Sequence, residues 1–183
     1  MNLVERIVVL HQRLAEAEVP HAFGGALALA WCTERARATI DIDLNVFVEH
    51  SEADPVLAAL PTGVQVTDAD RAAISEDGQT RLWWNGTPID IFFNTTEFHA
   101  AAAARARPEH FGGAVVPFLA CRDLAVFKAF FDRTKDWADL EEMQSAGTLD
   151  VEAVLGVLAL YLGGDDHRVA RLRDLAELPP STG

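Results

Sequence analysis

Apolar and polar residues alternate along residues 39–46, in a segment that continues to Val48. The segment reads Thr39, Ile40, Asp41, Ile42, Asp43, Leu44, Asn45, Val46, Phe47 and Val48. A period of two is typical of a β-strand, so we expect the aliphatic residues, Ile40 among them, to face a core. Asp41 and Asp43 would then project from the opposite face, roughly 7 Å apart along the strand. Two like charges so close repel, and a divalent cation between them would remove the conflict.

The rest of the first half predicts helices and short strands. Apolar residues at helical spacing predict a helix over 2–18, and strong helix formers predict a buried helix over 26–34. A short strand at 21–23 lies between them and ends at Gly24-Gly25. A further helix is expected over 52–60. Strands are expected at 64–66, 72–74, 81–84 and 88–93, the last two joined by a tight hairpin turn at Asn85-Gly86.

The second half is helical in pattern. Residues 96–106 are Ala-rich and predict a helix, and 115–119 predict a last extended piece. Four more helices are expected, at 121–133, 136–146, 150–162 and 165–177, before a tail at 179–183 that we expect to fray. A mixed sheet followed by helices indicates an α+β fold. We expect a core at 1–117 and a C-terminal helical region at 118–183, packed together as a single compact unit.

The composition fits one globular chain and disfavours some partners. The chain has 183 residues, of which 50% are hydrophobic, enough for one core and short for two independent domains. Its formal net charge of −13 works against non-specific binding to nucleic acid or anionic membranes. The 15 Lys and Arg residues are unevenly placed, which leaves room for a small basic rim.

The N-terminus and the cysteines bear on location. No signal peptide precedes the first helix and no apolar run approaches a membrane span, so we expect a cytoplasmic protein without membrane contact. Cys32 and Cys121 lie far apart and make no metal-site spacing. We expect each to be a buried apolar residue or a free thiol, in preference to a disulfide.

Three aspartates on strands form the candidate chemical centre. Asp90 lies between Ile89 and Ile91, which repeats the apolar-Asp-apolar pattern of Asp41 and Asp43. If the two strands are neighbours, the three carboxylates converge on one face. Carboxylates can hold two Mg²⁺ ions, one activating an attacking oxygen and one stabilising a leaving phosphate. The alternative is that the aspartates are solvent-facing residues of half-exposed strands.

Gly24-Gly25 follows a strand and precedes a helix. Such a turn lets phosphate oxygens approach backbone N–H groups near a helix N-terminus, where the helix dipole favours anions. Gly-Gly is also common in ordinary tight turns. At the hairpin, alternation makes one of Trp83 and Trp84 a core residue and leaves the other exposed, where it could stack on a base.

These motifs resemble the nucleotidyltransferase superfamily that includes DNA polymerase β. The resemblance rests on Phe23-Gly-Gly-Ala-Leu-Ala, Arg37-Ala-Thr-Ile-Asp-Ile-Asp-Leu44, Pro88-Ile-Asp-Ile-Phe92 and the segment Leu124–Leu140. The Gly-Gly form with Arg-x-Thr-x-Asp-x-Asp is closest to AbiEii-type toxin nucleotidyltransferases. In one respect the chain departs from the pattern, because many members carry Ser where it has Gly25.

The resemblance implies transfer of a nucleoside monophosphate from a Mg²⁺-NTP, ATP included, to a hydroxyl. Two Mg²⁺ ions, or Mn²⁺, would be held by the aspartates, and Asp90 would also help deprotonate the acceptor. Lys128 would neutralise the triphosphate, although it could equally extend to solvent. The implied site residues are Asp41, Asp43, Asp90 and Lys128 as catalytic, with Gly24, Gly25, Arg37, Thr39, Lys128 and Lys135 binding nucleotide.

Three functions follow from the resemblance. The first is a toxin of a toxin–antitoxin system that modifies the tRNA 3′ end and is neutralised by a cognate antitoxin. The second is transfer to a small hydroxylated molecule, as in aminoglycoside nucleotidyltransferases, where an acidic protein suits a cationic acceptor. The third is a catalytically silent binding module, against which the three retained aspartates argue.

Overall fold

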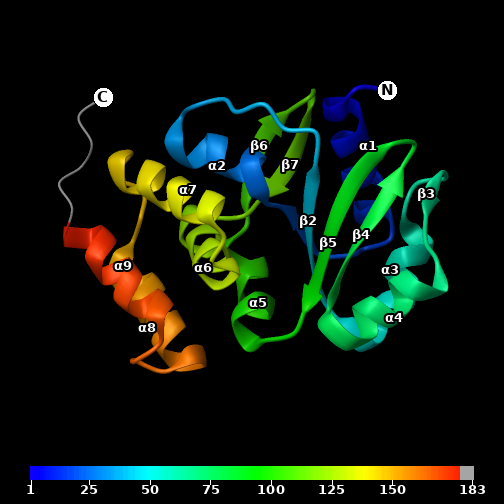
Figure 1. The fold of residues 1–183 in the computed structure, drawn as a ribbon. Coiled ribbons are helices and arrows are strands. Elements are labelled where there is room, and N and C mark those ends of the chain that lie inside the picture. The colour runs from blue at the N-terminus through cyan, green and yellow to red at the C-terminus, as the bar shows by residue number, and fades with distance from the viewer. Residues whose placement is uncertain (178–183) are drawn as a thin grey trace. The chain divides into compact units, whose positions relative to one another are not determined.

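The alternating segments of the first half join in one mixed sheet. The structure is a computed structural model that describes residues 1–177, and these contain seven strands in the order β3-β4-β5-β2-β1-β7-β6 (Figure 1). The strands are β1 (His21–Phe23), β2 (Ile42–Glu49), β3 (Val64–Gln65), β4 (Gln79–Trp84), β5 (Thr87–Asn94), β6 (Arg107–Phe111) and β7 (Ala114–Phe118). The pairs β2–β5 and β1–β7 are parallel, and the other pairs are antiparallel.

The contacts divide the chain into two units. Unit 1 comprises Met1–Gly25 and Ala38–Leu119, and unit 2 comprises Ala26–Arg37 and Ala120–Gly183. Unit 1 contains the sheet, α1 (Leu3–Glu16), α3 (Ala53–Ala59), α4 (Asp68–Asp77), α5 (Glu97–Ala102) and the 3₁₀ turns η1 (His50–Glu52) and η2 (Ala103–Arg105). Unit 2 contains most of α2 (Gly25–Thr33), with α6 (Cys121–Phe131), α7 (Thr134–Ser145), α8 (Val151–Leu162) and α9 (His167–Glu177).

One face of the sheet carries the core of unit 1. Ile42, Leu44, Leu82, Ile89 and Ile91 share this face and are fully buried. Helix α1 covers it with its own buried side chains: the Arg6 guanidinium lies over the Trp84 ring, 4.9 Å from its centroid, and donates to the Trp84 carbonyl at 2.9 Å. The opposite face is therefore the one left for the polar residues of β2, β4 and β5.

Two local expectations are wrong. Ile40 is 77% exposed, because β2 begins only at Ile42, so the buried face of this segment starts two residues later than the alternation implied. The expected strand at 72–74 is part of α4. A capping box between Thr67 and Asp70 starts this helix, and Gly78 in the left-handed conformation ends it. These end signals outweigh the apolar residues in the middle.

A strand that the pattern did not predict lies at the edge of the sheet. β6 pairs with β7 in antiparallel register and reads Arg-Pro-Glu-His-Phe. Most of its side chains are polar, and Pro108 removes one backbone donor. Such a sequence suits an edge strand, where one side of the backbone needs no partner. The other expected helices and strands are confirmed to within a few residues at their ends.

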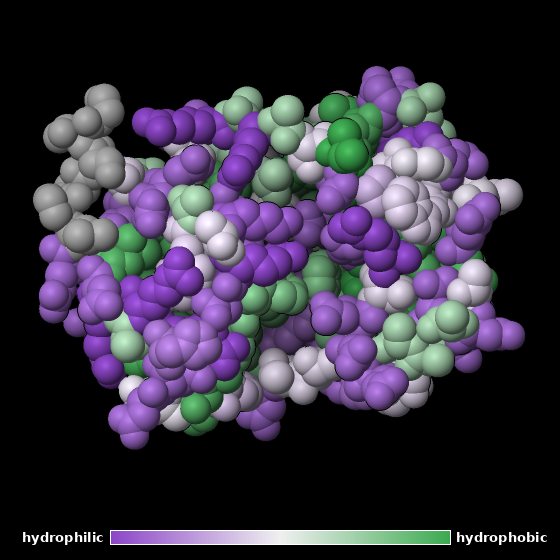
Figure 2. All heavy atoms as spheres, in the orientation of Figure 1, coloured by the Kyte–Doolittle hydropathy of each residue, from purple (hydrophilic) through white to green (hydrophobic). Residues whose placement is uncertain are grey.

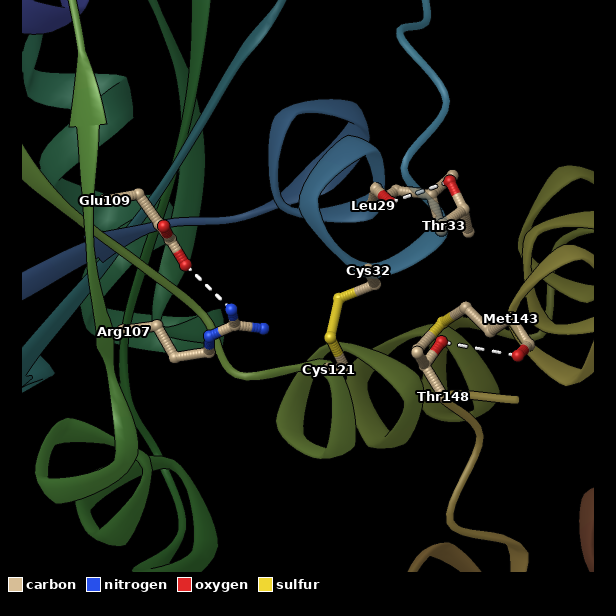
Figure 3. The surroundings of a disulfide bond; sticks show 8 residues. All are labelled: Leu29, Cys32, Thr33, Arg107, Glu109, Cys121, Met143 and Thr148. Carbon is tan, nitrogen blue, oxygen red and sulfur yellow. Dashed lines mark hydrogen bonds and ion pairs between the residues drawn. A yellow bond between two sulfur atoms is a disulfide. The ribbon is translucent and has the colours of Figure 1, made fainter. Parts of the chain in front are cut away.

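A disulfide joins two segments of unit 2, which corrects the expectation of free thiols. Cys32 in α2 and Cys121 at the start of α6 are bonded across a sequence separation of 89 residues, with their Cα atoms 5.6 Å apart (Figure 3). That spacing lies in the ordinary range for disulfides. The pairing cannot be predicted from cysteine spacing, because the two helices are brought together only by the tertiary fold.

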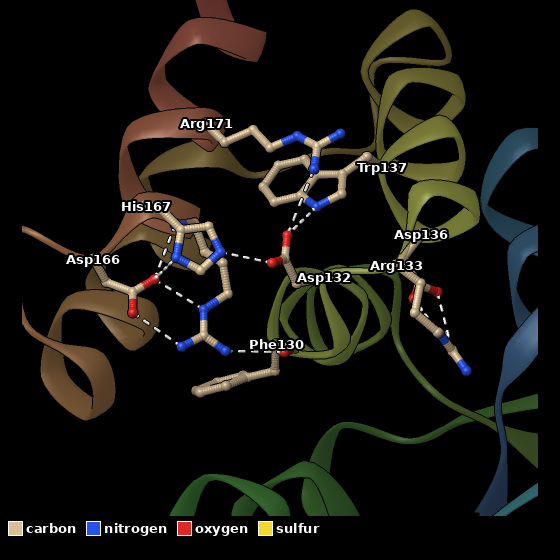
Figure 4. Close-up of polar contacts among 9 residues, drawn as sticks. Phe130, Asp132, Arg133, Asp136, Trp137, Asp166, His167 and Arg171 are labelled. Atoms are coloured by element: carbon tan, nitrogen blue, oxygen red, sulfur yellow. Dashed lines mark hydrogen bonds and ion pairs between the residues drawn. The ribbon is translucent and has the colours of Figure 1, made fainter.

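Charged contacts fix the end of α6 to the start of α9 (Figure 4). The Asp132 carboxylate accepts from Trp137 Nε1 at 2.7 Å and from His167 Nε2 at 2.6 Å. Arg168 donates to both oxygens of Asp166 and to the Phe130 carbonyl. These hydrogen bonds lower the pKa values of Asp132 and Asp166, the largest cause being His167 for Asp132 and Arg168 for Asp166.

The surface agrees with the acidic composition. On the face of the molecule drawn in Figure 2, hydrophilic residues predominate and apolar residues are scattered among them. Within residues 1–177, no helix is both long and apolar enough to span a bilayer. The tail at 179–183, for which we expect fraying, lies outside the described residues.

Candidate functional site

Asp43 and Asp90 lie side by side on the polar face of the sheet. β2 and β5 are parallel neighbours, and their register pairs Asp43 with Asp90 directly. Adjacent strands are about 4.8 Å apart, so the two carboxylates share one small area. The condition set by the sequence, that the two strands be neighbours, is therefore met.

Asp41 reaches the same area from the segment before β2. Its backbone is held by Thr39, whose hydroxyl accepts from the Asp41 N–H and also contacts the Asp41 carbonyl, both at 3.2 Å. Thr39 thus acts on the main chain that aims Asp41. Residues 38–41 also line an open pocket, which leaves this edge of the site accessible.

Arg81 completes the group and was missed by the sequence reasoning. Its guanidinium donates from Nε and Nη2 to the two oxygens of Asp90, each at 2.7 Å, and Nη2 lies 3.5 Å from Asp41 Oδ2. The pKa of Arg81 is raised by the hydrogen bonds that it donates to Asp90, with the charges of Asp41 and Asp43 adding to the effect. A signal existed: a two-residue turn at Asn85-Gly86 puts Arg81 opposite Asp90, as the β4–β5 register shows.

The glycine turn lies against the carboxylates. Gly24 donates its N–H to the Asp43 carbonyl at 2.9 Å, so this donor is already used within the protein. Gly25 adopts a left-handed φ of +56°, and a Cβ added there would lie 1.8 Å from Asp43 Oδ2. The absence of a side chain at Gly25 is what makes room for the Asp43 carboxylate.

The oxygen donors suit Mg²⁺, with one condition. Three carboxylates on one face are the hard ligands that this ion prefers, and the crowded negative charge favours a cation. Among residues 1–177, however, no three acidic, histidine or cysteine side chains already form a metal-ligand cluster. In this arrangement Arg81 provides the positive charge, so the donor set fits the ion once the guanidinium has left.

Trp83 adds an aromatic surface to the same face. Along β4, Leu82 and Trp84 are buried, whereas Trp83 is 46% exposed. Trp83 is two residues from Arg81 and is paired with Pro88, two residues from Asp90. The expected division into one core and one exposed tryptophan is confirmed.

Lys128 lies inside unit 2. Its side chain is 8% exposed, with Nζ 2.5 Å from Asp139 Oδ2 and 3.7 Å from Asp136 Oδ1. Buried charges are stable only when paired, and these two aspartates provide the pairing. The alternative of a lysine extended to solvent is therefore excluded, and its ammonium is committed to α7.

The remaining predicted nucleotide-binding residues, Arg37 and Lys135, also lie in unit 2, where Arg133 is a further cation that was not among them. Arg37 forms an ion pair with Asp139, and Arg133 donates to Asp136 at 2.6 Å. Both arginines are about half exposed, so they form a basic rim over the buried carboxylates. Lys135 is exposed on the first turn of α7.

The seven-stranded mixed sheet with its flanking helices is an α+β nucleotidyltransferase-like fold. The chain is similar to the antibiotic-resistance factor ANT(2″)-Ia in solution, with a TM-score of 0.62, 15% identity, and 93% of this chain and 95% of that chain covered. It is also similar to crystalline ANT(2″)-Ia in complex with adenylyl-2″-tobramycin, with a TM-score of 0.50, 15% identity, and coverage of 94% and 95%.

A third similar structure comes from a fungus. It is an antigenic nucleotidyltransferase-like protein from Paracoccidioides brasiliensis, with a TM-score of 0.50, 11% identity, and 94% of this chain and 85% of that chain covered. No protein-family model matches the chain, and no curated protein matches its sequence. At these sequence identities, the similarity shows the fold alone.

Proposed function

We propose that the chain is a Mg²⁺-dependent nucleotidyltransferase that moves a nucleoside monophosphate from an NTP to an acceptor hydroxyl. The observation that carries the proposal is the direct pairing of Asp43 with Asp90 on parallel strands, beside Asp41 and the Gly24-Gly25 turn. A structural sheet has no reason to gather three carboxylates on one face. The nucleotidyltransferase-like fold supports the same conclusion.

Each residue would have a defined task. Asp41 and Asp43 would hold two Mg²⁺ ions, and Asp90 would join the ion nearer the acceptor and take the proton of its hydroxyl. The ions would supply charge neutralisation for the triphosphate. Thr39 would keep Asp41 in place through the backbone, and the bare backbone of Gly25 would give the Asp43 carboxylate its room. Trp83 offers a flat surface on which a planar or ring-shaped group can pack.

The acceptor we favour is a small cationic molecule with a free hydroxyl, of the aminoglycoside kind. The net charge of −13 attracts cations and opposes polyanions. A similar fold, ANT(2″)-Ia, is known in complex with an adenylylated tobramycin, over nearly the same chain length.

Transfer to the 3′ end of tRNA, as a toxin held by an antitoxin, is the second candidate. Its support is the resemblance of the Gly-Gly form with Arg-x-Thr-x-Asp-x-Asp to AbiEii-type toxins, together with the half-exposed Arg37 and Arg133 of unit 2. A basic rim of this size could bind an RNA end despite the acidic total, and its binding would weaken steeply with salt.

One transfer assay separates these possibilities. The protein is incubated with Mg²⁺, each α-labelled NTP in turn, and either tobramycin or total tRNA. We expect label on tobramycin with wild type and a loss of at least about 100-fold with Asp43→Asn or Asp90→Asn. Arg71→Gln is the control, because Arg71 pairs with Asp54 away from the site.

The outcomes are distinct. Label on tRNA alone would contradict the small-molecule acceptor and support the toxin function. If that labelling also depended on Asp43, the proposed nucleotidyl-transfer reaction would stand. Nucleotide binding that survives Asp43→Asn, with no transfer to either acceptor, would contradict the proposed reaction and favour a silent binding module.

A further inference from the structure

Arg81 holds the carboxylate site in a closed ionic arrangement. Its two nitrogen donors engage both oxygens of Asp90 and reach Asp41. A parallel fork of this kind is among the stronger ion pairs, because it makes two charge-assisted hydrogen bonds in fixed geometry. Arg71 in the same unit has one carboxylate partner, Asp54, by contrast.

This arrangement works against the tasks proposed for Asp90. When both oxygens of a carboxylate accept from one guanidinium, each oxygen has fewer lone pairs left for a cation or a proton, and the positive charge beside them repels the cation. Arg81 is 48% exposed and lies on an exposed stretch of β4, so its side chain can rotate away without disturbing the core. The Asp90 side chain is 22% exposed and fixed by the register of β5, so it cannot follow.

We infer that Arg81 is a resident counter-ion that occupies the carboxylate site in the metal-free protein and must leave Asp90 before a divalent cation binds. The inference rests on the proposed function. Without Arg81, Asp41, Asp43 and Asp90 would place three negative charges on one face. With it, the free protein is stabilised and its affinity for a lone cation is reduced. The divalent cation would therefore bind mainly when it arrives together with a triphosphate. The triphosphate is a better partner for the Arg81 guanidinium than a carboxylate is.

The test is Mn²⁺ binding to nucleotide-free protein, measured by the electron paramagnetic resonance signal of the Mn²⁺ that remains free. We expect Arg81→Gln to bind Mn²⁺ about tenfold more tightly than wild type, because a competing positive charge has been removed. Without divalent cations, the same variant should unfold at a lower temperature than wild type. Added Mg²⁺ should remove this difference in unfolding temperature. If Arg81 had only a structural role, replacing it would weaken Mn²⁺ binding or leave it unchanged. The sign of the change in Mn²⁺ affinity therefore distinguishes the two roles.

Two more variants complete the design. Arg71→Gln removes an equally exposed arginine and should leave Mn²⁺ affinity unchanged. Arg81→Lys keeps the charge without the fork and should bind Mn²⁺ more tightly than wild type, which preserves the test if the glutamine variant is poorly folded.

The failures are distinguishable. If wild type binds Mn²⁺ through Asp43, as shown by its loss in Asp43→Asn, and neither Arg81 variant binds more tightly, the counter-ion role is wrong and the metal site stands. If no Mn²⁺ binds to wild type or to the Arg81 variants, both the counter-ion role and the proposed function are wrong.

Discussion

At the scale of single residues, the site depends on what is absent at Gly25. The left-handed backbone and the position of Asp43 Oδ2 leave no space for even one carbon atom. A serine, which many members of the resembled superfamily carry here, cannot be added to this arrangement without displacing the carboxylate. Gly25 therefore has no hydroxyl to offer a ligand, and the Asp43 carboxylate occupies the space beside the turn.

Gly25→Ala should abolish Mn²⁺ binding and nucleotidyl transfer while costing about 1–3 kcal/mol of stability from the left-handed φ. The control is Gly86→Ala, at φ +82° with nothing within 4 Å of its added Cβ. It carries the same kind of backbone strain and should leave Mn²⁺ affinity unchanged. Metal titration and urea unfolding of both variants measure this, and equal Mn²⁺ affinities would show that the contact of Gly25 with Asp43 is not part of the site.

The sequence predicts some of these residues and not others. Asp41, Asp43 and Asp90 follow from alternation alone, and the register of the two-residue hairpin places Arg81 opposite Asp90. The left-handed φ of Gly25 and its clash with Asp43 depend on how a turn and a neighbouring strand are juxtaposed. Such distances are set by the assembled sheet, which periodicity does not describe.

At the scale of elements, unit 2 is held together by a covalent and an ionic contact that its helical patterns do not reveal. The sequence predicts helices at 121–133 and 136–146, and the structure has them at Cys121–Phe131 and Thr134–Ser145. The burial of Lys128 against Asp136 and Asp139 is not predicted, because hydrophobic spacing gives no weight to a charge that is neutralised by its partners. Cys32 and Cys121 were likewise too distant in sequence to be paired by inspection.

Reduction of the disulfide should lower the free energy of unfolding by about 2–4 kcal/mol, the typical contribution of a disulfide. The reason is that the bond restricts the unfolded chain between Cys32 and Cys121. Denaturant unfolding with and without reductant measures the effect, and a Cys32→Ala/Cys121→Ala variant should be insensitive to reductant. An equal response of wild type and variant would show that the bond does not form. Disulfides persist mainly in oxidising compartments, so a cytoplasmic location stays a prediction.

At the scale of the whole molecule, the fold class was predictable and the grouping of segments was not. Alternation in the first half and helical spacing in the second predict an α+β chain, which the sheet and helices confirm. The strand order and the parallel pairing of β2 with β5 required the structure, since short strands carry no signal of which neighbour they choose. The same holds for residues 26–37, which group with the C-terminal helices.

Stability should fall as the pH is lowered from about 6.5 to 4. Burial lowers the pKa values of His21 and His99 to about 4, so both are neutral in the folded protein. A folded pKa below the unfolded one gives stability that is complete above pH 6.5 and is lost as the pH falls. The expected loss is about 2 kcal/mol per histidine at pH 5. Below about pH 4, protonation of Asp132 and Asp166, whose pKa values are lowered, should continue the decline.

Urea unfolding between pH 7.5 and 4.5 measures this dependence. His99→Gln should reduce the slope, although it also removes the edge-on contact of the ring with Phe47 at 5.7 Å. His110→Gln is the matched control, because His110 is exposed on β6, and its slope should equal that of wild type. A wild-type free energy that stays constant from pH 6.5 to 5 would contradict the buried neutral histidines.

The disulfide also closes about half of the chain into a covalent ring. The ring runs from Cys32 to Cys121 and includes residues 38–119, which form most of unit 1. A single protease cut anywhere inside it opens the ring without releasing a fragment, so nicked protein would migrate as one chain until a reductant is added. Limited proteolysis of this protein therefore has to be read on reducing gels, and a nicked molecule can keep the parts of its sheet together.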